Sequence, residues 1–93
     1  MMFRRRVDPP VRLPDPGEIL AVRAYEGYRP AEEPRAIVVD GAELAIDEIC
    51  WRASVADGGR RLRAFVVRAG GAKMRISYDE DTGMWTLERH LPG

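Results

Sequence analysis

The chain has 93 residues, of which 15 are Lys or Arg and 15 are Asp or Glu, so its formal net charge is zero. This length allows a single domain with one core and excludes an active site built among several lobes. Because positive and negative blocks cancel along the chain, the net charge itself says little about partners.

The first seventeen residues differ in composition from the rest. They hold four of the seven prolines and few apolar residues, which disfavours both a helix and a central strand. No run of about 18 apolar residues occurs, and the basic N-terminus is not followed by an apolar segment. Cys50 is the only cysteine, so an internal disulfide is excluded and a reducing compartment is the natural setting. We expect residues 1–17 to be a flexible proline-rich arm, residues 18–93 to be one domain, and the protein to be cytoplasmic with no membrane partner.

From Glu18 onward, short segments of alternating apolar residues follow one another between turn signals, which is the pattern of antiparallel strands. No segment has the 3.6-residue apolar spacing of a helix. The expected strands span residues 19–24, 36–39, 42–53, 61–69, 73–78 and 84–90.

Turn length decides which residues of neighbouring strands face each other, because a slip of one residue would move every apolar side chain to the other face. Two-residue turns at Asp40-Gly41 and Gly70-Gly71 bring large apolar residues together, and so does a four-residue loop at residues 80–83. For the remaining hairpin we expect a three-residue loop at residues 57–59, which places Trp51 opposite Phe65.

These registers define one apolar inner face of the sheet. Its expected members are Ile37, Leu44, Ile46, Ile49, Trp51, Phe65, Val67, Met74, Ile76, Tyr78, Trp85 and Leu87. With their rings in the core, Phe65, Tyr78, Trp51 and Trp85 are not expected to stack on bases. Tyr25 and Tyr28 are the aromatic residues expected to be exposed.

The third strand needs an irregularity, because Leu44 and Ile46 share an alternation that Ile49 and Trp51 do not. A β-bulge near Asp47-Glu48 reconciles the two halves and lets a long strand bend. The sequence therefore predicts an all-β domain: a small, strongly curved antiparallel meander of five or six strands, forming an SH3-like or partly open barrel, with a bulged long third strand.

The predicted core and turns contain the succession Glu33-Pro34-Arg35-Ala36-Ile37, Asp40-Gly41, Ile49, Trp51, Phe65-Val66-Val67, Tyr78-Asp79-Glu80, Gly83 and Trp85-Thr86-Leu87. This succession resembles a family of short uncharacterised bacterial β-domain proteins, and similar segments occur at the C-terminus of some Y-family DNA-polymerase-like proteins. The likeness covers about residues 18–89. It implies a small β-fold and a DNA-repair setting, and it transfers no catalytic residue.

Residues 60–75 carry six positive charges and no acidic residue. Arg68 is expected opposite Lys73, and like charges in that position destabilise a sheet. A bound phosphate would relieve the repulsion, which makes DNA or RNA a candidate partner, whereas an ion pair between Arg75 and Glu88 would neutralise part of the charge. The candidate nucleic-acid-binding residues are Arg60, Arg61, Arg68, Lys73 and Arg75.

Other polar residues do not form a recognisable catalytic or metal-binding motif. The acidic turn at residues 79–81 lacks the spacing of a calcium site and is expected to be solvated. Cys50 is expected to be a buried small side chain, and His90 stands alone near the C-terminus. We therefore expect no catalytic residue, no metal and no cofactor.

The sequence favours a non-enzymatic bacterial interaction module that binds a protein partner or itself through its surface or its edge strands. The alternative is an accessory nucleic-acid-binding domain that uses the basic hairpin. An enzyme would require a polar pocket containing Cys50 or His90.

Overall fold

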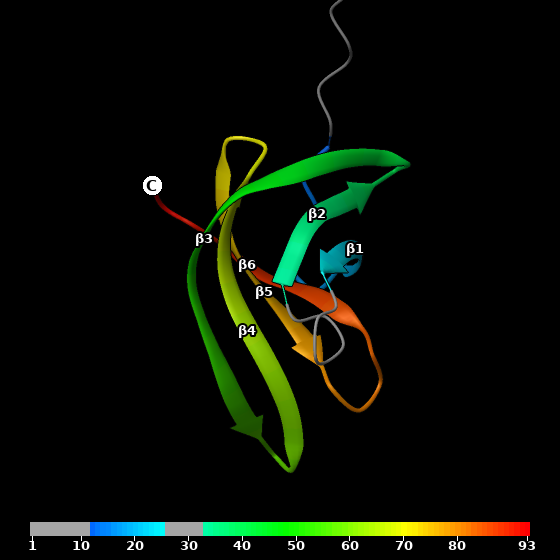
Figure 1. Ribbon diagram of the computed structural model, residues 1–93, viewed down its shortest axis with the longest axis vertical. Coiled ribbons are helices and arrows are strands. Elements are labelled where there is room, and N and C mark those ends of the chain that lie inside the picture. The colour runs from blue at the N-terminus through cyan, green and yellow to red at the C-terminus, as the bar shows by residue number, and fades with distance from the viewer. Residues whose placement is uncertain (1–11, 26–32) are drawn as a thin grey trace, which may run out of the picture.

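The computed structural model describes residues 12–25 and 33–93, and within them the chain forms a closed antiparallel barrel of six strands without a helix. The strands follow one another around the barrel in chain order (Figure 1). The all-β meander predicted from the sequence is confirmed. The strands are β1 (Ile19–Tyr25), β2 (Glu33–Val39), β3 (Ala42–Asp57), β4 (Arg60–Ala69), β5 (Ala72–Asp79) and β6 (Trp85–Leu91).

The barrel closes through a short ladder between its first and last strands. Only Ile19 and Leu20 of β1 pair with β6. Two further backbone hydrogen bonds extend this seam, from Gly17 N to Leu87 O (2.7 Å) and from Leu87 N to Glu18 O (3.0 Å). The closure therefore rests on a few residues, whereas the hairpins are paired along much of their length.

Two of the tight turns have the predicted length. Asp40-Gly41 and Gly70-Gly71 are two-residue turns in which both residues have positive φ, as a type I′ turn requires. The predicted registers around them are confirmed, since Ile37 pairs with Leu44 across the first turn and Met74 pairs with Val67 across the second. The loop at residues 80–83 also sets Tyr78 opposite Trp85 as predicted.

The turn between β3 and β4 is shorter than predicted. It consists of Gly58 and Gly59 alone, with φ values of 58° and 83°, so Asp57 pairs directly with Arg60. The predicted three-residue loop was wrong, because two adjacent glycines adopt both positive-φ positions of a type I′ turn without a third residue.

β3 carries two irregularities instead of one. The register shift between Ile46 and Glu48 is the predicted bulge. A second shift, between Ile49 and Trp51, leaves Cys50 as the extra residue, and the sequence did not indicate it. Ile49 still pairs with Val67 as expected.

The second bulge reverses the orientation of the side chains that follow it. Trp51 pairs with Val66 rather than with Phe65, faces outward and is 43 % exposed. Cys50 is exposed as well. The predictions that Trp51 belongs to the core and that Cys50 is buried were therefore wrong.

The core lies inside the barrel and is otherwise close to the predicted inner face. Trp85 is its aromatic centre, with ring centroids 5.6 Å from Phe65 and 5.0 Å from Tyr78. Ile46, Ile49 and Tyr78 are partly buried against it. The buried apolar cluster comprises Leu20, Ile37, Val39, Leu44, Phe65, Val67, Ala69, Met74, Ile76, Trp85 and Leu87.

Residues 12–17, at the end of the predicted arm, lie against the barrel, and residues 1–11 of that arm are outside the described residues. Pro14 is fully buried, and its carbonyl oxygen lies 2.8 Å from Nε2 of His90. Arg12 bonds to Glu18 (2.8 Å) and Asp40 (3.0 Å). The bond from Arg12, together with the backbone N–H of Asp15, lowers the pKa of Glu18 to about 2.

Replacement of a buried core side chain should lower the free energy of unfolding of this barrel far more than replacement of an exposed one. Ile76 is fully buried, and we expect Ile76→Ala to reduce the free energy of unfolding by about 2–5 kcal/mol, since it leaves a cavity. Met84 is 42 % exposed, so Met84→Ala should cost no more than about 0.5 kcal/mol. Urea unfolding followed by tryptophan fluorescence measures both, and equal losses would contradict this core assignment.

Candidate functional site

The five predicted nucleic-acid-binding residues do not form one patch. Arg60 and Arg68 lie near opposite ends of β4, eight residues apart, which corresponds to about 27 Å of extended strand. Arg61 is next to the first of them, whereas Lys73 and Arg75 lie on β5 towards the second. The basic segment is continuous in sequence but divided in space.

Acidic residues from neighbouring strands and turns pair with most of these cations. Lys73 is the exception, since it has no ion pair with any residue that the structure describes, and it lies opposite Arg68 as predicted. This local compensation reduces the positive field that the sequence suggests. The pairs are Arg60 with Asp79 (2.6 Å), Arg61 with Glu80 (3.9 Å), Arg68 with Glu48 (3.6 Å) and Arg75 with Glu88 (2.9 Å).

The predicted contact between Arg75 and Glu88 forms, although its register differs from the prediction. A register shift next to Arg75 makes Arg89 its Cα partner on β6. The Arg75 side chain nevertheless reaches Oε1 of Glu88 through its Nε.

Asp79 anchors the turn between β5 and β6 and is nearly buried. Its Oδ2 accepts hydrogen bonds from Arg60, and its Oδ1 accepts the backbone N–H groups of Asp81 (2.8 Å) and Thr82 (3.2 Å). These bonds, that from Arg60 above all, hold the pKa of Asp79 below its ordinary value. The bond between the two side chains also raises the pKa of Arg60. The expectation of a merely solvated acidic turn was wrong for Asp79, which is part of the fold.

Trp51 forms an exposed aromatic surface on the outer face of β3. The guanidinium carbon of Arg75 lies 5.1 Å from the centroid of a Trp51 ring, reaching it across Val66 of β4. A cation–π contact at an exposed site contributes about 0.5–1 kcal/mol. The sequence did not indicate this surface, because nothing in the pattern of residues around Cys50 predicted a bulge there.

β3 is much longer than its partner β2, and part of one of its edges has no partner strand among the described residues. The ladder between the two strands ends where Ala45 pairs with Ala36, whereas β3 continues to Asp57. Beyond Ala45, β3 pairs only with β4 among the residues described. Figure 1 shows the end of the β3–β4 hairpin projecting from the rest of the barrel.

The last part of this edge, residues 51–57, is free of irregularities, and we refer to it as the open edge of β3. The turn makes Asp57 and Arg60 a hydrogen-bonded pair, and such pairs alternate along an antiparallel ladder. It follows that Arg52, Ser54 and Ala56 direct their backbone N–H and C=O groups away from β4. All three residues are exposed.

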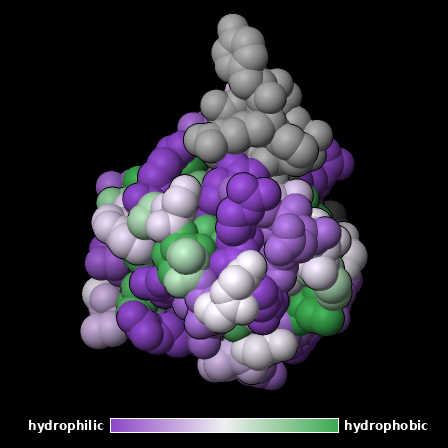
Figure 2. All heavy atoms as spheres, turned by 90° about the horizontal axis from the view of Figure 1, so that it is seen from below, coloured by the Kyte–Doolittle hydropathy of each residue, from purple (hydrophilic) through white to green (hydrophobic). Residues whose placement is uncertain are grey.

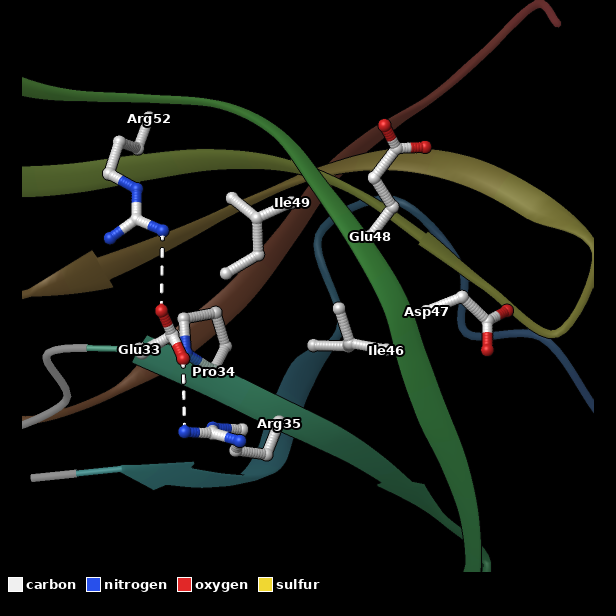
Figure 3. Close-up of a pocket in the computed structure, with 8 residues that line it drawn as sticks. All are labelled: Glu33, Pro34, Arg35, Ile46, Asp47, Glu48, Ile49 and Arg52. Carbon is white, nitrogen blue, oxygen red and sulfur yellow. Dashed lines mark ion pairs between the residues drawn. The ribbon is translucent and has the colours of Figure 1, made fainter.

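A cleft of about 270 Å³ opens where β2 and β3 separate. Figure 3 shows Pro34, Ile46 and Ile49 facing its interior. On one side, Glu33 bonds to both Arg35 (3.1 Å) and Arg52 (3.5 Å), as the dashed lines indicate. The residues that line the cleft are Glu33, Pro34, Arg35, Ile46, Asp47, Glu48, Ile49 and Arg52.

A second cleft, of about 370 Å³, lies beside the open edge near the tip of the hairpin. Neither Cys50 nor His90 is among the residues that line these two clefts. The second cleft is lined by Ser54, Val55, Ala56, Arg61, Leu62 and Glu80.

Figure 2, which views the molecule from the end where the hairpin tip lies, shows a mainly hydrophilic surface with small, separate hydrophobic areas.

The other residues that could bind a metal ion or a ligand do not gather into a site in the described part of the chain. In the described ranges, no set of three His, Cys, Asp or Glu residues could hold a metal ion. The same part of the chain contains no helix able to cross a membrane. Tyr25 is 54 % exposed as expected and lies under the guanidinium of Arg35, whereas Tyr28 is outside the described residues.

Comparisons with protein-family models, with curated proteins and with solved structures found no match for this chain. The candidate interaction surface is therefore defined by the geometry of the chain itself. It consists of the open edge of β3, the exposed Trp51 and the two clefts beside them.

Asp79 should make the stability of the barrel depend on pH. A carboxylate whose pKa is lowered by folding stabilises the native state above the ordinary carboxyl pKa of about 3.9, and this contribution is lost as the pH falls through the native pKa. We expect Asp79→Asn to unfold at lower urea at pH 7 and to lose less stability than the wild type between neutral and acid pH. Urea titrations at a series of pH values measure this.

Asp47→Asn is the matched control, because Asp47 has no ion pair with any described residue. Its unfolding should depend on pH as that of the wild type does. An identical pH dependence in Asp79→Asn and the wild type would contradict the role assigned to Asp79.

Proposed function

We propose that this chain is a non-enzymatic interaction module that binds a polypeptide by adding it as a strand to the open edge of β3. The observation that carries the proposal is the length of β3, whose sixteen residues extend far beyond its ladder with β2. In strand addition, main-chain hydrogen bonds supply affinity and side-chain sites on the two faces supply specificity.

The composition of the open edge supports this proposal. Natural edge strands are commonly protected from pairing by charged side chains, lysine above all, and by proline, bulges or short length. Bulges at Asp47 and Cys50 protect the middle of β3 in this way, but residues 51–57 contain no proline, no lysine and no bulge, and their two charged residues, Arg52 and Asp57, lie towards the two ends of the segment. This segment is left as the part of the edge where a partner strand can pair.

The surroundings of the open edge offer contacts for the side chains of an added strand. Trp51 lies at one end on the outer face, and tryptophan is enriched among residues that dominate binding energy. One cleft includes Arg52, and the other is lined in part by residues 54–56. An added strand would therefore meet an aromatic surface on one face and two clefts with both polar and apolar lining residues on the other.

Ser54→Pro should abolish this binding without unfolding the barrel. The substitution removes the central outward N–H of the edge, and proline is tolerated on an edge strand where the N–H faces solvent. We expect the variant to keep its far-UV circular dichroism spectrum. Of any protein that the immobilised wild-type chain captures from lysate, the variant should retain about a tenth of the amount or less. Mass spectrometry identifies and quantifies the captured proteins.

Ser54→Thr keeps the N–H group and is the control for this experiment. It should capture the same proteins as the wild type. If Ser54→Pro also retained them in equal amounts, strand addition at this edge would be ruled out.

The basic hairpin supports a second candidate function, an accessory nucleic-acid-binding domain. The specific observation is that Arg68 lies opposite Lys73, so two like charges are adjacent on β4 and β5. Arg68 donates a hydrogen bond to the carbonyl oxygen of Gly93 (2.8 Å), and a phosphate could relieve the remaining repulsion. The ion pairs around Arg60 and Arg75 limit this candidate site to the Arg68 end.

NMR titration with short single-stranded and double-stranded DNA and RNA tests the second candidate. Binding should shift resonances in residues 60–75 at low salt, fade at moderate salt and weaken for every sequence in the Arg68→Glu, Lys73→Glu double variant. Arg35→Glu, a charge reversal on β2, is the control and should bind as the wild type does. Unchanged affinity in the double variant would exclude this site.

A further inference from the structure

We infer that the strand added to the open edge of β3 is the open edge of a second copy of this chain, in antiparallel orientation about a two-fold axis at Ser54. The inference rests on the proposed function and names the partner. It follows from the position of the bulge and the turn, from the direction of the backbone groups and from the side chains that this arrangement brings together.

The open edge has a natural centre of symmetry. It begins after the bulge at Cys50 and ends before the turn at Gly58, so Ser54 lies at its middle with three residues on either side. A two-fold axis at Ser54 pairs the whole segment with itself. An axis displaced by one residue, to Ala53, would instead place Ala56 against the bulge of the other chain and interrupt the ladder.

The same axis satisfies the outward backbone groups. Ser54 faces the partner's Ser54, and Arg52 faces the partner's Ala56, so residues with outward groups meet one another on both sides of the axis. Each such hydrogen-bonded pair exchanges two N–H···O bonds. Every outward N–H and C=O group of the open edge thereby finds a partner, which is what an edge strand lacks in the single chain.

The side chains and charges of the edge fit this register. On the outer face, Ala53 lies opposite the partner's Val55, a small residue against a β-branched one on each side of the axis. Trp51 lies opposite the partner's Asp57, whose carboxylate would meet the indole N–H and the guanidinium that Arg75 holds 5.1 Å from the ring.

The inner face also avoids repulsion between like charges in this register. Arg52 lies opposite the partner's Ala56 and remains free to keep its ion pair with Glu33 of its own chain. A two-fold axis at Arg52 would instead set two guanidinium groups directly opposite each other, which is unfavourable. The arrangement joins two hairpins into one four-stranded sheet with a barrel at each end.

Cysteine cross-linking of mixed chains tests both the partner and the register. Residues 53 and 55 of the two chains form a non-hydrogen-bonded pair with Cα atoms about 4.5 Å apart, which is within the range that a disulfide spans. The two variants are Ala53→Cys and Val55→Cys, each combined with Cys50→Ser to remove the exposed native thiol. We expect the oxidised mixture to give a disulfide-linked dimer that joins one chain of each kind, whereas neither variant alone should cross-link efficiently.

Three results would overturn the inference. Efficient cross-linking of Ala53→Cys with itself would place the axis at Ala53, and absence of a mixed dimer would exclude pairing of this segment. Sedimentation equilibrium supplies the third result, because the wild-type chain should be dimeric and Ser54→Pro monomeric. A monomeric wild-type chain across the concentrations of the cross-linking experiment would exclude the dimer.

These outcomes separate the inference from the function on which it rests. A monomeric wild-type chain that loses captured proteins upon Ser54→Pro would overturn the second-copy partner and leave strand addition standing. Unchanged capture by Ser54→Pro, with a monomeric wild type, would overturn both.

Discussion

The structure depends on the mismatch in length between β3 and the two strands that pair with it, β2 and β4. β3 has sixteen residues, β2 has seven, and the separation of the two strands leaves backbone groups on one side of β3 without a partner in the described chain. Backbone groups are obligatory hydrogen-bonding groups, so an edge of this length must either be solvated or pair with another strand. The cleft between β2 and β3, the exposed hairpin and the proposed site all follow from this mismatch.

Two bulges determine what that edge presents. The bulge at Asp47 bends β3 and lets Ile46 and Ile49 both face the core, although they are three positions apart and would face opposite sides of a regular strand. The bulge at Cys50 turns Trp51 outward, where the guanidinium of Arg75 makes a cation–π contact with its ring. Trp51 therefore lies on the surface and not in the predicted core, because one extra residue in a strand reverses the facing of every side chain that follows it.

Charge in this protein is balanced locally as well as overall. The basic segment in β4 and β5 faces acids supplied by β3, β6, the turn after β5 and the end of β5 itself, where Asp79 is the most buried of them. Arg60 and Asp79 are nineteen residues apart and meet because β4 and β5 are neighbours. A run of like charges in the sequence is therefore a poor guide to surface potential in a sheet, where the nearest charges belong to other strands.

Much of the fold could be predicted because it depends on local chemistry. Gly70-Gly71 and Asp40-Gly41 accept positive φ, alternating apolar residues define one face, and the parity change before Ile49 requires a bulge, so the sequence by itself determined the meander, most of the registers and nearly all of the core. Only the tertiary structure decided three other features. These are the bulge at Cys50, the ion pair between Arg60 and Asp79, and the early end of the β2–β3 ladder. Each depends on how strands distant in sequence meet around a closed barrel, and no residue pattern along a single strand encodes that meeting.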